Sequence, residues 1–189
     1  MYICGMSPNS WFAIRAFKGR VFRLKEEFEN AGWKTYIALR ATKEVKDGHQ
    51  VRRDVQIIPQ LLFVCCPVDW LTTYKNNEFR NDWFMIYRHT VTSESGLKSL
   101  EPAPISEEEM QVFMFVTSTN DGQDITYYGD HLPEYSEGEQ VRVTEGIYKG
   151  ATGIVRRIKR DRKLLIAIEG VAVVAVSNIP MAYLEKISV

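Results

Sequence analysis

The sequence lacks the features of a membrane-spanning, secreted or disulfide-bonded protein. In its 189 residues, no apolar run approaches the ~20 residues that a membrane-spanning helix needs. The amino terminus has neither the basic flank nor the apolar stretch of a signal peptide. There are only three cysteines, Cys4, Cys65 and Cys66, and an odd number with two adjacent residues suits a reducing compartment better than a disulfide framework. These absences predict a cytoplasmic protein.

Motifs for catalysis and metal binding are also missing. The three histidines, His49, His89 and His131, share no spacing with a carboxylate or thiol partner. No Cys-x-x-Cys or His-x-x-x-His pair indicates a metal site, and neither a phosphate-binding loop nor a nucleophile elbow occurs. We therefore expect no enzymatic activity, no metal and no cofactor.

Charge is balanced overall but unevenly distributed. The chain has 24 basic and 24 acidic residues, so its net charge gives no indication of nucleic-acid binding. Residues 119–138 contain five acidic and no basic side chains, whereas residues 139–189 contain nine basic and five acidic side chains. A polar, acidic segment with glycine between two apolar-rich segments indicates a linker. We expect a domain at 1–118, a flexible acidic linker at 119–136 and a second domain at 137–189.

The first domain has the pattern of an α+β fold. Apolar and β-favouring runs predict strands at 11–17, 35–45, 51–57, 61–66 and 83–87. Apolar spacing predicts helices near 21–28, at 69–76 and from Ser106, where Ser106 and Glu109 form a capping box. Asp47-Gly48 between two extended runs predicts a hairpin. This order favours helices packed against an antiparallel sheet, as in an α/β sandwich.

The second domain has short strand patterns at close spacing, which predict a small all-β barrel. They occur at 141–143, 152–158, 164–168, 171–176 and 183–187. The basic segment Arg156–Lys163 would form one hairpin. It is either a solvated hairpin protected by charge or a patch that faces RNA or protein. In the first domain, Lys18, Arg20 and Arg23 cluster at a helix start and could touch phosphates.

Residues 139–155 resemble a KOW motif, which implies an SH3-like barrel. The residues that carry the motif are Gly146, Tyr148, Gly150 and Gly153. A tight turn is needed at Gly146, and the two later glycines let the chain reverse into the next strand. The runs 11–17 and 59–64 and the Ser106 helix resemble, in order and spacing, the amino-terminal (NGN) domain of NusG-type transcription factors. The resemblance extends over about residues 10–188.

Within that family the sequence is similar to specialised paralogues. Residues 168–187 and the segment 104–110 resemble the UpxY-like antiterminators of capsular polysaccharide operons. Leu71-Thr72-Thr73 falls where RfaH has a His-Thr-Thr element, with Leu71 in place of the histidine. The resemblance implies an antitermination or elongation factor that acts at specific operons. Two alternatives stay open: a housekeeping NusG-like elongation or termination factor, and a ribosome-associated KOW protein that binds RNA.

The resemblance also implies partners and contact residues. The β′ clamp helices of RNA polymerase would be met by Arg15, Leu61 and Phe63. The β gate loop would be met by Thr72 and Thr73. Non-template DNA would be met by Lys18, Arg20 and Arg23. A partner of the KOW barrel would be met by Ile168, Glu169, Arg156 and Arg157.

A carboxylate at Glu169 replaces an aromatic anchor of housekeeping NusG, and this change argues against Rho binding. A small-subunit ribosomal protein is the other partner that the resemblance implies for the barrel. We expect a monomer without a membrane partner.

Overall fold

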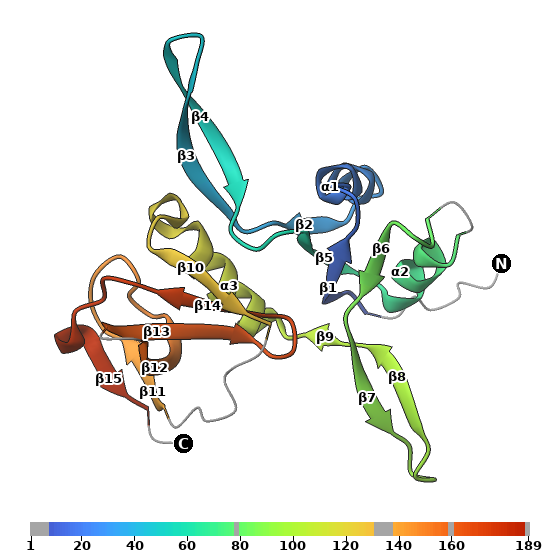
Figure 1. Cartoon of the computed structure of the whole chain (residues 1–189). Coiled ribbons are helices and arrows are strands. Elements are labelled where there is room, and N and C mark those ends of the chain that lie inside the picture. Colours follow the sequence, from blue (N-terminus) through green and yellow to red (C-terminus); the bar gives the residue numbers. More distant parts are fainter. Residues whose placement is uncertain (1–7, 78–79, 131–137, 159–160, 188–189) are drawn as a thin grey trace. The chain divides into compact units, whose positions relative to one another are not determined.

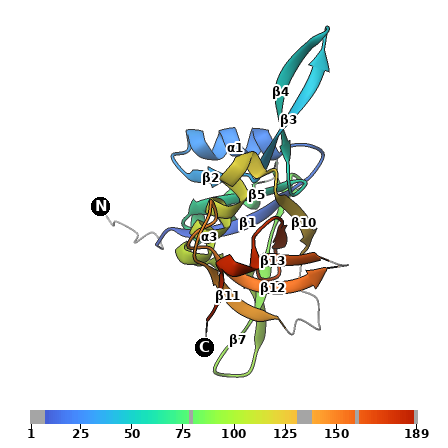
Figure 2. The same ribbon diagram turned by 90° about the vertical axis from the view of Figure 1, so that its left-hand side faces the viewer.

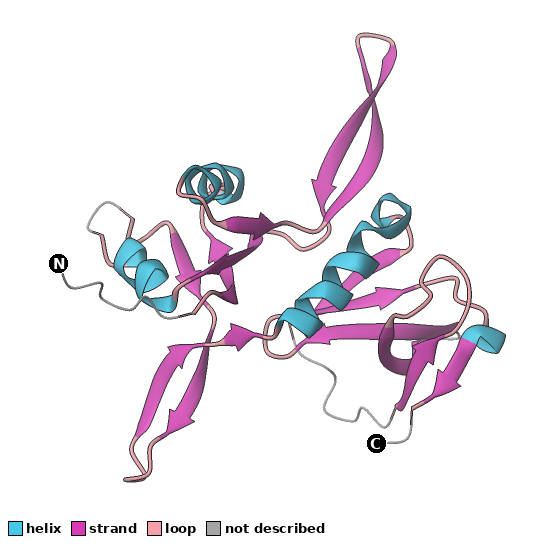
Figure 3. Cartoon of the chain, turned by 180° about the vertical axis from the view of Figure 1, so that it is seen from behind, coloured by secondary structure: helices cyan, strands magenta, loops and turns pink. Residues whose placement is uncertain are grey.

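The computed structural model of the chain describes residues 8–77, 80–130, 138–158 and 161–187 (Figure 1). It divides into two compact units. The first contains Met1–Ile37 and Gln60–Glu107, and the second contains Ala38–Pro59 and Glu108–Val189. Strands make up most of the regular structure in both units (Figure 3). Across the described residues, no helix combines the length and the apolar character needed to cross a membrane.

The first unit is built on an antiparallel sheet. Its strands are β1 (Ser10–Ala16), β2 (Lys34–Tyr36), β5 (Leu61–Cys66), β6 (Phe84–Ile86) and β9 (Pro104–Ile105). The order is β2-β5-β1-β6, and β9 also pairs with β1. The continuous apolar run of β5 lies between β2 and β1, and all of its residues except Cys65 are buried. The strand predicted at 61–66 is therefore confirmed, and it lies inside the sheet with both faces buried.

Helices α1 (Val21–Asn30) and α2 (Val68–Lys75) pack on one face of this sheet. The Phe28 ring of α1 meets the Phe84 ring edge-on at 6.2 Å and the Trp70 ring of α2 at 5.5 Å. Such edge-to-face pairs add to the stabilisation from burial. Since Ala16 lies opposite Phe84 in register, the even-numbered residues of β1 face the helices. The odd-numbered residues face the other side of the sheet.

Each unit also contains a two-stranded ribbon. Strands β3 (Leu39–Lys46) and β4 (His49–Gln56) form the hairpin predicted from Asp47-Gly48, and both turn residues have positive φ angles of 52° and 80°, as a tight hairpin turn requires. Figures 1 and 2 show β3 and β4 as an extended ribbon. Strands β7 (Arg88–Thr92) and β8 (Lys98–Pro102) form the other ribbon, which the sequence analysis did not predict.

The second unit contains a six-stranded antiparallel sheet in the order β10-β14-β13-β12-β11-β15. The strands are β10 (Ile125–Gly129), β11 (Glu139–Val143), β12 (Thr152–Ile158), β13 (Asp161–Ile168), β14 (Ala172–Val176) and β15 (Leu184–Lys186). Helix α3 (Glu107–Ser118) and the short 3₁₀ segments η1 (Thr119–Gly122) and η2 (Met181–Tyr183) complete it. All five residues of β14 are buried. The antiparallel α+β fold expected from the sequence is confirmed.

The segment expected to be a linker, residues 119–136, contains regular structure. Strand β10 lies within it and pairs with β14, with Ile125 opposite Val176. Ile125 is fully buried. The run Ile125–Tyr128 favours a strand, and the acidic residues on both sides obscured this signal in the sequence. Residues 131–136, His131 and Cys4 lie outside the described part of the chain.

Candidate functional site

One face of the first sheet brings together the residues predicted to contact the clamp helices. Arg15 lies opposite Leu61 and Ala13 opposite Phe63 in register, and alternate side chains share a face. Leu61 is only 2% and Phe63 only 1% exposed, while Arg15 is half-buried. The two apolar residues therefore form the packed base of this face, and Arg15 brings polar atoms to its surface.

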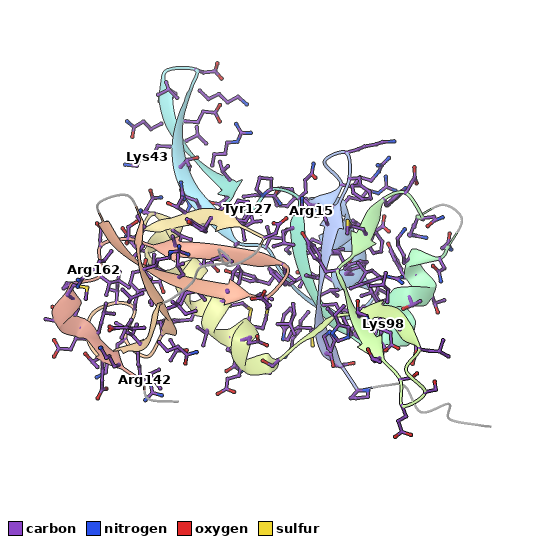
Figure 4. The ribbon with its side chains drawn as sticks, turned by 60° about the horizontal axis from the view of Figure 1, so that its bottom comes forward. Arg15, Lys43, Lys98, Tyr127, Arg142 and Arg162 are labelled. Carbon is purple, nitrogen blue, oxygen red and sulfur yellow. The ribbon has the colours of Figure 1, made fainter. Side chains whose placement is uncertain are left out.

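The accessible part of this face includes residues that the sequence analysis did not single out. Arg15 donates hydrogen bonds from Nε and Nη2 to the Tyr87 hydroxyl at 3.0 and 2.7 Å. Met85 lies opposite Arg15 in register and is 43% exposed. Figure 4 labels Arg15 among these side chains. Because residues 83–87 are all apolar or aromatic, no alternation in the sequence could identify Met85 as the exposed member.

Helix α2 carries the predicted gate-loop residues. Leu71 is fully buried, Thr72 is half-buried and Thr73 is exposed. The leucine that stands in place of a histidine therefore fixes α2 to the core. Of the two threonines, Thr73 is the more accessible to a partner.

A basic and aromatic cluster surrounds Trp83. The guanidinium carbon of Arg23 lies 4.4 Å from the centre of the Trp83 ring. Those of Arg20 and Arg80 lie at 5.2 and 5.8 Å. Lys18 is exposed on the turn before α1, and Nη1 of Arg20 is buried without a hydrogen-bond partner. Arg80 and Trp83 could not be assigned to this cluster from the sequence, because they lie far along the chain from α1.

Glu27 holds two arginines of this cluster in place. Its carboxylate accepts hydrogen bonds from Arg23 at 3.0 Å, from Arg80 at 3.2 Å and from the Tyr74 hydroxyl. Burial alone would raise the pKa of Glu27, but the hydrogen bonds from Tyr74, Arg23 and Arg80 outweigh it and lower the pKa. Burial and the neighbouring Glu27 raise the pKa of Tyr74 to about 12. The cluster is thus a fixed arrangement of cations beside an indole ring.

The KOW-like residues of the second unit shape its turns. Gly146 and Gly150 have φ angles of 81° and 94°, a region that glycine adopts without strain. Gly153 is needed for a different reason, since a Cβ there would lie 2.4 Å from the Leu165 carbonyl oxygen. Tyr148 is 4% exposed. These residues have structural roles in the sheet.

Asp124 ties the segment before β10 to the rest of the unit. Its carboxylate accepts hydrogen bonds from Asn120 at 2.7 Å, Asn178 at 3.0 Å and the Tyr148 hydroxyl at 3.3 Å. These bonds, above all the one from Asn120, lower the pKa of Asp124. Its carbonyl also accepts from the Ser177 N–H at 2.9 Å. The start of the segment expected to be a linker is therefore firmly attached.

The predicted partner residues of the barrel are not equally accessible. Ile168 is only 2% exposed, whereas Glu169 is exposed. Glu169 lies in the turn after β13, where the Val171 N–H donates a hydrogen bond to the Ile168 carbonyl. Arg156 is half-buried on β12, and the side chain of Arg157 lies outside the described part of the structure.

Two exposed apolar residues of the second unit were not predicted from the sequence. Ile147 is 60% and Met181 is 46% exposed. Neither follows an alternating pattern that would distinguish a surface residue from a core residue.

Metal chemistry finds no support in the described residues, where no group of three or more histidine, cysteine, aspartate or glutamate side chains could hold an ion. Cys66 is buried, and burial raises the pKa of its thiol to about 12. A neutral buried thiol behaves as a small hydrophobic side chain.

Comparisons with known proteins place the chain in a family. A family model described as transcription termination factor NusG matches residues 9–114. Among solved structures, one described as domain interaction in Thermotoga maritima NusG is 16% identical to this chain, with a TM-score of 0.44. The match covers 95% of this chain and 98% of that chain. The comparison with curated proteins finds no match. Because the family model covers more than half of its length, the chain belongs to the NusG family of transcription factors.

Proposed function

We propose that this chain is a specialised NusG paralogue, similar to the UpxY and RfaH antiterminators. It binds RNA polymerase and suppresses pausing or termination at particular operons, such as capsular polysaccharide clusters. The observation that carries the transcription role is the family match over residues 9–114. The resemblance of segments 104–110 and 168–187 supports the specialised role. The protein acts as a cytoplasmic monomer through binding alone, without chemistry of its own.

The polymerase dock is the sheet face that carries Arg15, Leu61 and Phe63. The burial of Leu61 and Phe63 makes them its base, and the exposed Met85 beside Arg15 supplies an apolar anchor. A few such anchors carry most of the energy of an interface. The β′ clamp helices are the partner of this face, and Thr72 and Thr73 of α2 meet the β gate loop.

The cluster around Trp83 binds the non-template DNA strand. Lys18, Arg20 and Arg23 supply the positive charge, and the adjacent Arg80 increases it. An indole ring beside guanidinium groups suits an unpaired strand, whose bases stack on aromatic rings while its phosphates meet cations.

The second unit would bind a small-subunit ribosomal protein. The exposed carboxylate of Glu169 argues against an apolar contact with Rho, because an unpaired ion would have to be buried. The alternative of a housekeeping elongation factor predicts the opposite, namely tight Rho binding.

Calorimetric titration of the full chain with a fragment carrying the β′ clamp helices tests the dock. We expect a Kd of about 1 μM or tighter, which corresponds to about −8 kcal/mol. Met85→Asp should weaken binding by at least about tenfold, because an anchor becomes a charge. Phe22→Asp is the matched control, since Phe22 is an exposed apolar residue of α1 on the helical side of the sheet. Equal affinities for both variants would refute the dock.

Transcription through a terminator in vitro tests the direction of the effect. Increased readthrough with the full chain is expected. If the chain instead enhances Rho-dependent termination, the result favours the housekeeping alternative.

A further inference from the structure

The second unit contains a small pocket beside the turn that follows β11. Its volume is about 240 Å³, below the roughly 300 Å³ at which sites for drug-sized ligands begin. Three segments that lie far apart along the chain line it: the residue before β10, the turn between β11 and β12, and the stretch from the end of β14 into η2. Its polar and aromatic lining residues are Asp124, Glu145, Tyr148, Asn178 and Tyr183. The pocket therefore has the size of a single side chain or a small molecule.

Hydrogen bonds and packing join the three segments. The Ser177 N–H donates to the Asp124 carbonyl at 2.9 Å, and the Thr144 N–H donates to the Tyr183 carbonyl at 2.8 Å. The Tyr183 ring packs against the turn, since a Cβ on Gly146 would lie 3.4 Å from two of its ring carbons. The lining is therefore formed before any ligand binds, which lowers the entropic cost of binding.

The lining is acidic. It contains two carboxylates, Asp124 and Glu145, and no lysine, arginine or histidine; we call it the acidic pocket. Three neutral side chains donate hydrogen bonds to the Asp124 carboxylate, namely Asn120, Asn178 and Tyr148. Because these donors carry no charge, they fix the carboxylate in place and leave its negative charge uncompensated. Glu145 is exposed to solvent on the same pocket.

This lining distinguishes between classes of ligand. A phosphate group would be repelled by two carboxylates with no cation in the lining. A purely apolar ligand would remove these carboxylates from water without compensation. A metal ion is not favoured either, since the described residues contain no group of three or more histidine, cysteine, aspartate or glutamate side chains that could hold one. An organic cation suits the pocket best, because carboxylates and aromatic rings both attract it.

We propose that the acidic pocket binds the guanidinium group of an arginine side chain that a partner protein presents. A guanidinium group is planar, has five N–H donors and stacks on aromatic rings. The two carboxylates and the Tyr183 ring match these properties. The Asn178 side chain donates through Nδ2 to Asp124, so its carbonyl oxygen is a further acceptor. The ammonium group of lysine is a compact and strongly hydrated charge, and it matches fewer of these groups.

The apolar residues of the pocket and its rim favour a protein as the source of the arginine. Ile179 and Pro180 line the pocket and suit the apolar stem of an arginine side chain. Ile147 also lines it and is 60% exposed, and Met181, which follows Pro180 at the start of η2, is 46% exposed. Contacts around a central anchor exclude water in protein interfaces. A free amino acid would instead bring its own carboxylate close to the acidic lining.

The acidic pocket goes beyond the proposed function, which assigns no role to it, and it does not depend on the polymerase dock. It lies in the second unit. Its lining contains none of the residues predicted to meet a partner of the barrel, which are Arg156, Arg157, Ile168 and Glu169.

An NMR titration of the isotope-labelled full chain tests the proposal. The probes are free arginine and three end-blocked peptides, in which arginine, lysine or citrulline is flanked by two glycines on each side. Citrulline has nearly the shape of arginine but no charge. The arginine peptide should cause saturable shifts of the Asn178 side-chain amide and of the Gly146 backbone amide. It should bind about tenfold more tightly than the citrulline peptide, because hydrogen bonds with a charged group are stronger. The lysine peptide and free arginine should also bind more weakly.

Two variants and a matched control locate the binding. Glu145→Gln removes one charge of the lining, and Tyr183→Leu removes the ring. Each should weaken binding of the arginine peptide by about two- to fivefold. Glu185→Gln is the control, since Glu185 is an exposed carboxylate of the same unit that does not line the pocket. It should leave the affinity unchanged.

Three results would overturn the proposal: the absence of saturable shifts, equal affinities for the arginine and citrulline peptides, and equal losses in Glu145→Gln and Glu185→Gln. Free arginine that binds as tightly as the arginine peptide would overturn the assignment to a partner protein. Shifts that follow the expected order would establish a site for a basic side chain.

Discussion

Replacing Phe63 by alanine distinguishes a core residue from a docking anchor. Phe63 is 1% exposed, lies opposite Tyr36 and has its ring centre 6.5 Å from that of Tyr36. Loss of a fully buried phenylalanine side chain costs about 3–5 kcal/mol, because contacts are lost and a cavity is left. A domain of this kind has only about 5–15 kcal/mol in total. Phe63→Ala should therefore remove a large part of the stability of the first unit.

Thermal unfolding followed by circular dichroism measures this loss. For a unit of under 100 residues, 1 kcal/mol shifts the Tm by about 4–8 °C, so we expect a fall of at least about 12 °C. Met85→Ala is the control, because Met85 is 43% exposed and surface substitutions change stability by about 0.5 kcal/mol or less. A fall of less than about 4 °C for Phe63→Ala would mean that its ring is not packed in the core, and would make it a direct anchor for polymerase.

Three further predictions follow from the same contacts. Gly153→Ala should lower the unfolding free energy by about 1–3 kcal/mol in chemical denaturation, since its Cβ would lie 2.4 Å from a backbone oxygen. Gly150→Asn should cost less, because the space around Gly150 is open and asparagine tolerates a positive φ. A larger loss for Gly150→Asn than for Gly153→Ala would contradict the packing. The pKa of Glu27 is lowered from 4.5, so its contribution to stability is present above pH 4.5 and lost as the pH falls through the folded-state pKa. The stability difference between wild type and Glu27→Gln should shrink on acidification, and a constant difference would refute this coupling. In an ultraviolet titration, Tyr74 should ionise near pH 12, and the Tyr74→Phe variant should lack this part of the titration curve. If the variant instead lacks a tyrosine that ionises near pH 10, the burial of Tyr74 is contradicted.

Much of the fold could be predicted from the sequence because local chemistry and tertiary structure agree. The aromatic run of β1, the apolar spacing of α1 and the Asp47-Gly48 turn each favour the structure that they adopt. The β7–β8 ribbon was missed because it has little apolar alternation, and Leu97 and Leu100 are exposed. A ribbon without a buried face gives no hydrophobic period to recognise.

The candidate site was less predictable because it depends on which face each residue occupies. Arg15, Leu61 and Phe63 share a face of the sheet, but their burial differs. The grouping of Arg20, Arg23 and Trp83 arises from the packing of α1 beside β6. Sequence spacing carries no information about such a contact between distant segments.

The pairing of β1 sets the order in which the first unit can form during synthesis. Its partners are β5, β6 and β9. Trp11 pairs with Ile105, which lies near the other end of this unit along the chain. Strands β11 to β14 instead pair mostly with the next strand along the chain. Pairing between distant residues is slow because a long loop must close first. On the ribosome, β1 must therefore wait for β5 before it can pair, and its last partner, β9, follows only at Pro104–Ile105. The later hairpins can close as they emerge.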